Sequence, residues 1–216
     1  MTGFTTIAMD PPWTERGGGK IKRGADRHYG VMGKVEILKT VQETDKWQQR
    51  DTESCSLWMW ATVNHLPDAL WLMDALGAEY VTNAAWVKAE DMGERIVRLD
   101  EMDEIDARVV VPQAPGLGQR LRMCHEHLLF GRIGRVPVPA PADRMPSVIY
   151  APRGKHSAKP AEAYSLIERH DRPGRRLEMF ARNLRHGWEV WGDDIVIIPG
   201  RVSTVTVNTG GVEPLI

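Results

Sequence analysis

Residues 4–13 read FTTIAMDPPW, an apolar run that stops at a carboxylate, two prolines and an indole. The run 4–9 is apolar and rich in β-branched residues, which predicts a short buried strand. The strand must end at Asp10, because the prolines at 11 and 12 remove two backbone donors and fix φ. In an open α/β sheet, ligands bind beyond the carboxyl ends of the strands. The polar turn that follows this strand is therefore the first candidate for a functional site.

The rest of the chain alternates between short strand-like and helix-like patterns. Gly77 is expected to cap the second of three helices, because glycine commonly ends a helix. An alternation of strands and helices predicts an α/β fold whose central sheet is mostly parallel, with helices on both faces. Beyond 4–9, the expected strands are 56–61, 80–87, 126–130, 147–150, 176–180 and 188–191, and the expected helices are 33–44, 65–76 and 160–168.

Length and composition narrow the class of protein. The 216 residues include 28 Lys and Arg against 29 Asp and Glu, so the chain as a whole is not a strongly basic polyanion binder. Cys55 and Cys124 are too few for a disulfide framework, and no apolar run is long enough to span a membrane. No signal peptide is visible, so we expect a cytoplasmic protein without a membrane partner.

One domain is expected over residues 1–198, with 199–216 as a C-terminal hairpin or tail. Residues 14–29 carry five basic side chains among glycines and are interpreted as a mobile basic loop, the first candidate for phosphate contacts. Residues 89–119 are acidic at first and then rich in Pro and Gly, which is typical of an insertion or lid.

The turn Asp10-Pro11-Pro12-Trp13 has the chemistry to hold a base. Stiffened by its prolines, it is expected to leave its carbonyls unpaired, so that Asp10 and the Pro11 carbonyl together accept two hydrogen bonds from one exocyclic amine. The Trp13 indole can lie flat on a purine or pyrimidine ring. The alternative is a proline-terminated strand with a solvated aspartate.

A second candidate precedes the last expected helix. Lys159 stands just before a helix N-terminus, where exposed amides and a cation favour a small carboxylate or a phosphate. The alternative is ordinary capping of the helix by Ser157 beside a solvated lysine.

Two further groups of polar residues are candidates for a ligand or metal site. Glu178 on a strand and the turn Asp193-Asp194 could hold the hydroxyls of a ribose, although satisfied carboxylates at strand ends are common. The run Cys124-His125-Glu126-His127 suggests zinc at first sight, but alternate residues of a strand point to opposite faces, so four ligands cannot converge. No metal site is expected.

Taken in order, these motifs resemble the DPPW-type N6-adenine methyltransferases, the family that includes the eukaryotic messenger-RNA adenosine methyltransferase and bacterial and phage DNA-adenine methyltransferases. The resemblance extends to about residue 194. It implies a Rossmann-like methyltransferase fold with permuted motif order and S-adenosyl-L-methionine as the methyl donor. The matching segments are 10–13, 28–30, 57–60, 86–88, 116–118, 122, 126, 156–160, 177–182 and 187–192.

The resemblance also implies roles for individual residues. Asp10, Pro11, Pro12 and Trp13 form the catalytic turn, in which Asp10 and the Pro11 carbonyl orient the adenine amine. The acceptor side is implied at Tyr29, Trp86, Lys88 and Glu126. The donor is implied at His156, Ser157, Lys159, Glu178, Phe180, Arg182, Asp193 and Asp194, with Lys159 at the donor carboxylate. The turn Gly192-Asp193-Asp194 departs from the family, which usually has Asn at the second position, where Asp cannot donate a hydrogen bond.

The function that follows is N6-adenine methylation of nucleic acid. DNA is favoured, because the chain is compact and shows no added RNA-binding module. RNA is the alternative substrate, and a non-catalytic nucleic-acid-binding subunit is the alternative of another class. A nicotinamide-dependent oxidoreductase ranks lower, because no Gly-x-Gly-x-x-Gly follows the first strand. A monomer or homodimer is expected, with a partner subunit left open.

Overall fold

The computed structural model describes residues 3–14, 31–98, 104–112, 120–154 and 158–192. Within these ranges the expected elements are present; apart from β3, their boundaries are shifted by a few residues, and Gly77 has the positive φ of 78° expected of a helix cap. The elements in chain order are β1 (Phe4–Met9), α1 (Lys34–Glu43), α2 (Asp45–Gln48), β2 (Ser54–Thr62), η2 (Val63–His65), α3 (Leu66–Ala75), β3 (Glu79–Arg98), β4 (Glu104–Pro112), β5 (His125–Gly134), η3 (Pro141–Asp143), β6 (Val148–Ala151), α4 (Ala161–His170), β7 (Arg175–Met179) and β8 (Glu189–Trp191).

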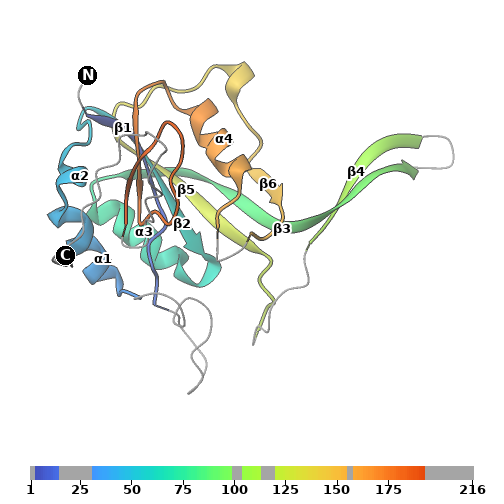
Figure 1. Cartoon of the computed structure of the whole chain (residues 1–216), viewed down its shortest axis with the longest axis horizontal. Helices are drawn as coiled ribbons and strands as arrows, with labels where there is room; N and C mark the ends of the chain where they lie inside the picture. Colours follow the sequence, from blue (N-terminus) through green and yellow to red (C-terminus); the bar gives the residue numbers. More distant parts are fainter. Residues whose placement is uncertain (1–2, 15–30, 99–103, 113–119, 155–157, 193–216) are drawn as a thin grey trace, which may run out of the picture.

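These strands form one sheet in the order β4-β3-β5-β2-β1-β7-β8, with β6 paired to β3 (Figure 1). The pairings β1–β2, β1–β7, β7–β8 and β3–β6 are parallel. The pairings β2–β5, β3–β5 and β3–β4 are antiparallel. Among the described strands, four of the seven pairings are therefore parallel, which confirms the expected mostly parallel α/β sheet.

The central strands are covered on both faces. Ile7 and Met9 of β1 join a core cluster with α1 and α3, whereas Ala8 faces a second cluster with α4. β2 divides in the same way, because successive side chains of a strand point to opposite faces. Burial on both sides explains why β1 reads as a continuous apolar run. In the following, the side with α4 is called the α4 face.

The third strand differs most from the sequence-based expectation. β3 does not end near residue 87 but continues to Arg98 and pairs with β4 as an antiparallel hairpin that extends away from the sheet (Figure 1). Much of the segment expected to be an insertion or lid is thus regular strand, and whether it acts as a lid stays a prediction. Residues 99–103 and 113–119, all of the expected basic loop 14–29 except Thr14, and the tail 199–216 lie outside the described residues.

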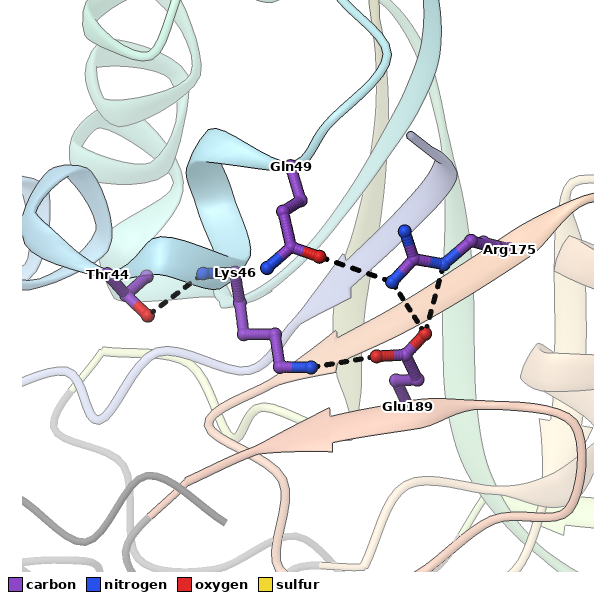
Figure 2. A network of polar contacts seen from close by, with 5 residues as sticks. All are labelled: Thr44, Lys46, Gln49, Arg175 and Glu189. Atoms are coloured by element: carbon purple, nitrogen blue, oxygen red, sulfur yellow. Dashed lines mark hydrogen bonds and ion pairs between the residues drawn. The ribbon is translucent and has the colours of Figure 1, made fainter. Parts of the chain in front are cut away.

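A polar network joins the edge strand β8 to α2 at the amino ends of the parallel strands (Figure 2). Glu189 accepts from Lys46 Nζ at 2.8 Å and from Arg175 Nε and Nη2 at 3.1 and 2.8 Å. Arg175 Nη2 also donates to Gln49 at 3.3 Å, and the Thr44 hydroxyl accepts from the backbone N–H of Lys46. We call these five residues the amino-end network. It fixes α2 and β8 to the sheet, far from the Asp10 turn.

No helix in the described ranges is long and apolar enough to cross a membrane.

Candidate active site at the carboxyl ends of the strands

The Asp10 turn lies where several strands meet at one edge of the sheet. β1, β2, β7 and β8 are aligned in parallel, so their carboxyl ends share this edge. The backbone N–H of Asp10 donates to the Met179 carbonyl at 3.3 Å, which couples the turn to the end of β7. Antiparallel β5 begins at the same edge, because Glu126 is paired with Thr62. Side chains distant in the sequence therefore converge around Asp10.

The turn itself is held by its own backbone. The Trp13 N–H donates to the Pro11 carbonyl at 2.9 Å, and the Met32 N–H donates to the Pro12 carbonyl at 2.8 Å. The expectation that both carbonyls are unpaired is therefore wrong, because the chain folds back over the prolines. A carbonyl oxygen has two lone pairs, so the Pro11 carbonyl can still accept a second hydrogen bond.

Trp13 is built into the core rather than displayed at the surface. Its ring is 7% exposed, stacks on His65 at 5.5 Å between centroids, and donates its N–H to the Trp60 carbonyl at 3.1 Å. These contacts fix the position of the turn. Stacking of a base on Trp13 stays a prediction, and it would need the ring face that His65 does not cover.

A chain of alternating charges begins at Asp10 and runs across the α4 face. Lys159 Nζ lies 3.0 Å from Asp10 Oδ1 and 3.1 Å from Glu126 Oε2. Lys88 Nζ lies 2.6 Å from Glu126 Oε1, and Arg182 Nη2 lies 3.9 Å from Asp10 Oδ2. We call Lys88, Glu126, Lys159 and Asp10 the site network. Each of the four side chains is less than a fifth exposed.

Burial and neighbouring charges shift the pKa values in this network in opposite directions, and the neighbouring charges have the larger effect. Burial alone would raise the pKa of Glu126, but Lys159 and Lys88 outweigh it and lower this pKa to about 2. Burial alone would lower the pKa of Lys159, but Asp10 and Glu126 outweigh it and raise this pKa above its ordinary value. Both groups are therefore ionised at neutral pH.

A second polar group adjoins the site on the strand β7. Tyr164 donates its hydroxyl to Glu178 at 2.5 Å, and Arg185 Nε lies 3.7 Å from the same carboxylate. Burial raises the pKa of Glu178, and Tyr164 and Arg185 offset this shift only in part. Glu178 thus lies on the α4 face, but α4 and the loop after β7 already provide its hydrogen-bond and ion-pair partners.

The residue after β7 and the end of β8 are packed closely together. Phe180 has φ of 59°, in the left-handed region that is uncommon for residues other than glycine, and its ring lies edge-on to Trp191. Ala181 N–H donates to the Trp191 carbonyl at 3.0 Å, and a Cβ on Gly192 would lie 2.4 Å from the Ala181 carbonyl oxygen. Glycine is therefore required at 192, and this close packing directs Arg182 back toward Asp10.

Of the residues implied for the site, the structure brings Asp10, Lys88, Glu126, Lys159 and Arg182 together. Trp86 lies beneath them, 2% exposed, with its indole N–H bonded to the Ala151 carbonyl at 2.9 Å, so direct contact with substrate stays a prediction. Tyr29, His156, Ser157, Asp193 and Asp194 lie outside the described residues. In the described part of the chain, no group of three or more His, Cys, Asp and Glu is arranged for a metal ion.

His65 and Tyr164 also belong to the candidate active site, although the sequence did not identify them. His65 follows β2 at the carboxyl edge and stacks on Trp13, while its Nδ1 lies 3.2 Å from Asp68. Tyr164 lies one turn into α4 and reaches Glu178. Their positions in the sequence could have identified them. His65 follows the carboxyl end of β2, and Tyr164 lies in the first turns of α4, which begins beside the Asp10 turn.

Comparison with known proteins identifies the family of the chain. The MT-A70 family model matches residues 4–194. The chain belongs to the MT-A70 family. Members of this family are S-adenosylmethionine-dependent methyltransferases, so the family, fold and methyl donor expected from the collinear motifs are confirmed.

Several MT-A70 relatives are similar over 89% of this chain. The type II methyltransferase M.MunI of Mycoplasma sp. is 25% identical over 206 residues, which cover 78% of that relative. The human N(6)-adenine-specific methyltransferase METTL4 is 25% identical, and the N6-methyladenosine RNA methyltransferase MTA1 of Cryphonectria parasitica (strain ATCC 38755 / EP155) is 28% identical. The matched regions cover 38% and 52% of these two, so the chain spans only part of their length.

The polar groups at the edge have the chemistry that the MT-A70 methyl donor requires. S-Adenosylmethionine presents a carboxylate, an ammonium group and ribose hydroxyls. Lys159 and Arg182 can bind a carboxylate, and Glu178 can accept hydrogen bonds from an ammonium group or hydroxyls. All three lie on the α4 face or at the strand ends that adjoin it, so the residues present fit the donor.

Proposed function

We propose that the protein transfers a methyl group from S-adenosylmethionine to the exocyclic N6 of adenine in DNA. Membership of the MT-A70 family supports methyl transfer, and the names of two relatives specify N6 of adenine or adenosine. DNA is favoured because the chain is compact, shows no added RNA-binding module, and matches 78% of the length of the type II methyltransferase M.MunI.

The observation that carries the proposal is the position of Asp10. Its carboxylate stands at the carboxyl end of β1 on a turn whose backbone is fixed at Pro11, Pro12 and Trp13. Lys159 lies 3.0 Å from Oδ1, and Oδ2 faces the more distant Arg182 at 3.9 Å, so Oδ2 and the second lone pair of the Pro11 carbonyl can accept from an amine. Two acceptors held on a rigid turn determine the direction of the amine lone pair.

This geometry is suited to catalysis by positioning. The donor, when bound, would supply an electrophilic methyl group that leaves its sulfur for N6, and the proton released by the methylated amine would pass to solvent water. Asp10 and the Pro11 carbonyl need only orient N6, because full removal of an amine proton before attack would be unfavourable at neutral pH. Correct orientation of two reactants is among the largest contributions that an enzyme makes.

An adenine in a duplex must leave the base stack to reach a site at this edge. The target base would then be held by its exocyclic amine, which thymine lacks and which guanine and cytosine carry at other ring positions. We expect transfer to adenine, with DNA that lacks adenine as the control, and faster transfer to single-stranded or mismatched adenine than to a fully paired one.

The test is methyl transfer from labelled S-adenosylmethionine to adenine-containing DNA and, separately, RNA, with N6-methyladenine detected by mass spectrometry. Asp10→Ala should reduce the rate on the order of 10³-fold or more, while calorimetry shows donor affinity within a few-fold of wild type. Asp143→Ala is the matched control, since this aspartate is half-exposed and its Oδ1 lies 3.7 Å from Arg169 Nε, away from the site.

The outcomes separate the alternatives. Donor binding without transfer to any polynucleotide would overturn the proposal in favour of a non-catalytic subunit. Transfer to RNA with none to DNA would retain the chemistry and overturn the choice of substrate. Full activity in Asp10→Ala would remove Asp10 from the reaction.

A further inference from the structure

Lys88 lies two steps away from the reacting group, which raises the question of what it does. Its ammonium contacts Glu126 at 2.6 Å, Glu126 contacts Lys159 at 3.1 Å, and Lys159 contacts Asp10 at 3.0 Å. The four side chains come from β3, β5, the segment before α4 and the end of β1. In the described part of the chain, Lys88 has no ion pair with Asp10 itself. Its effect on Asp10 must therefore pass through Glu126 and Lys159.

The backbone around Lys88 is fixed independently of these charges. Its N–H donates to the Cys124 carbonyl at 2.8 Å, and its residue is paired with Ala151 in β6. The ammonium lies 5.2 Å from the centroid of the buried Trp86 ring, a distance at which a cation is attracted to an aromatic face. Lys88 is thus a fixed positive charge at one end of the network.

Lys88 is one of the two cations that contact Glu126, and Lys159 is the other. Without Lys88, Glu126 would keep only the Lys159 ammonium, which it shares with Asp10, whereas Asp10 would keep Arg182 at 3.9 Å as well. The Lys159 ammonium would be drawn toward Glu126, since the second oxygen of Glu126 would have lost its cation. A buried carboxylate left without its partner is costly, so one carboxyl would tend to take up a proton.

We propose that Lys88 is a positioning residue: by holding one oxygen of Glu126, it directs the other oxygen to Lys159 and keeps the Lys159 ammonium shared between Glu126 and Asp10. The oxygen of Asp10 that Lys159 contacts is thereby defined, and the other oxygen is kept for the amine. This inference rests on the proposed function of Asp10 as the acceptor of the adenine amine. It differs from the role expected from the sequence, in which Lys88 contacts the substrate directly.

The first experiment needs no activity. In protein labelled with ¹³C at the side-chain carboxyls, the Glu126 signal is assigned with Glu126→Gln and titrated by NMR. Lys159 and Lys88 face this carboxyl, and Asp10 and Arg182 lie next along the chain of charges. Wild type should titrate near pH 2. Lys88→Met should raise the midpoint by about one pH unit or more, and Lys88→Arg should restore most of the shift.

The second experiment measures methyl transfer by the same variants. Lys88→Met should lower kcat on the order of tenfold, with the KM for the polynucleotide and the calorimetric Kd of the donor nearly unchanged, and Lys88→Arg should recover part of the rate. Lys46→Met is the matched control, because it breaks a lysine–glutamate pair of similar length, 2.8 Å, at the opposite end of the strands. It should leave both kcat and the Glu126 titration as in wild type.

Other results would overturn the inference. An unchanged Glu126 titration in Lys88→Met would show that the pair is not coupled in solution, and a change in KM alone would assign Lys88 to substrate contact. If Lys88→Met does not fold by circular dichroism, Lys88→Gln and Lys88→Arg carry the same two tests. If wild type transfers no methyl group, the proposed function fails, while the NMR titration still decides whether Lys88 controls Glu126.

Discussion

The two ends of the same sheet hold two polar networks of similar size and different character. The amino-end network around Glu189 has a lysine and an arginine on a carboxylate that is 30% exposed, and Arg175 is 37% exposed (Figure 2). The site network has two lysines and two carboxylates, all less than a fifth exposed. Water can reach Glu189 and Arg175 of the first network when their contacts break, although Lys46 is itself only 10% exposed, and it reaches the carboxylates of the second network less.

This difference bears on what each network is for. Half-exposed ion pairs contribute little to stability, and buried ion pairs lose much of their Coulomb energy to desolvation. Apolar side chains of equal volume would often stabilise a buried position better. Burying four charges at the carboxyl edge is therefore hard to explain by stability alone. The amino-end network fixes two elements, whereas the site network keeps charged groups ready beside Asp10.

The sharpest way to break this comparison is to remove one lysine from each network. Lys159→Met leaves two buried carboxylates without their shared cation, so we expect it to lower the free energy of unfolding by about 3–5 kcal/mol. Lys46→Met leaves Glu189 with Arg175 and solvent, so we expect a loss of less than about 1 kcal/mol. Urea denaturation at pH 7 measures both.

Equal losses in the two variants would contradict the distinction between the ends of the sheet. Because Lys159→Met could unfold the protein, Lys159→Gln provides a polar variant of lower volume in which the direction of the effect should be the same. Lys159→Gln should also abolish most methyl transfer, whereas Lys46→Met should not change it.

Acid titration sharpens the comparison further. The pKa of Glu126 is lowered to about 2 in the folded protein, so the unfolded chain binds a proton at this group at higher pH than the folded one. The stability that Glu126 contributes is therefore fully present above its ordinary pKa of 4.5 and is lost as pH falls from there toward 2. In this window wild type should lose up to about 1.4 kcal/mol per pH unit more than Glu126→Gln.

The measurement is urea denaturation at several pH values between 2 and 6, with Glu189→Gln as the matched control. The pKa of Glu189 is also lowered, since hydrogen bonds from Lys46 and Arg175 outweigh its burial, but its carboxylate is more exposed. A slope in Glu126→Gln as steep as that of wild type would show that other carboxylates carry the acid sensitivity.

The sequence was enough to predict the strand 4–9, the turn that ends it and the place of Lys159 before a helix, and the family resemblance added Lys88, Glu126 and Arg182. Asp10 could be placed because an apolar strand followed by two prolines must stop there, and the carboxyl end of such a strand is a site in this class of fold. Lys159 could be placed before a helix because the helical pattern begins at residue 160, a proline, which is common in the first turn of a helix. These are local signals, readable within a few residues.

The contacts between those residues could not be predicted in the same way. Glu126 meets Lys88 because β3 and β5 are antiparallel and in a register that pairs Trp86 with Glu126, and neither direction nor register is written in either strand. Lys159 was expected at a donor carboxylate, and it lies between two carboxylates of the protein. The continuation of β3 beyond Lys88 was missed because charged residues there hide the strand pattern.

Asp171 shows the same limit away from the site. It follows α4 as an ordinary polar residue, yet its carboxylate accepts from Thr6, Ser56 and Trp58 at 2.9–3.0 Å and lies 2.8 Å from His170 Nδ1. Three of these partners come from β1 and β2, more than a hundred residues earlier. A buried carboxylate satisfied by neutral donors of other strands has no signature in its own neighbourhood.

We expect the smallest change in stability from a substitution in the amino-end network. Glu189→Gln removes the charge that Lys46 and Arg175 share while leaving an oxygen and a similar volume in place. Because Glu189 is 30% exposed and its partners can turn to water, we expect less than about 1 kcal/mol of destabilisation and no change in methyl transfer. Thermal unfolding at low and at high salt measures the change in stability, and the small difference should shrink further at high salt, because salt screens partly exposed charges.

Glu189→Leu is the companion variant, since it also removes the hydrogen-bond acceptor. A loss in Glu189→Gln as large as that in Lys159→Gln, or a fall in kcat, would mean that the amino ends of the strands determine the geometry at Asp10, and the two networks would then be one system rather than two.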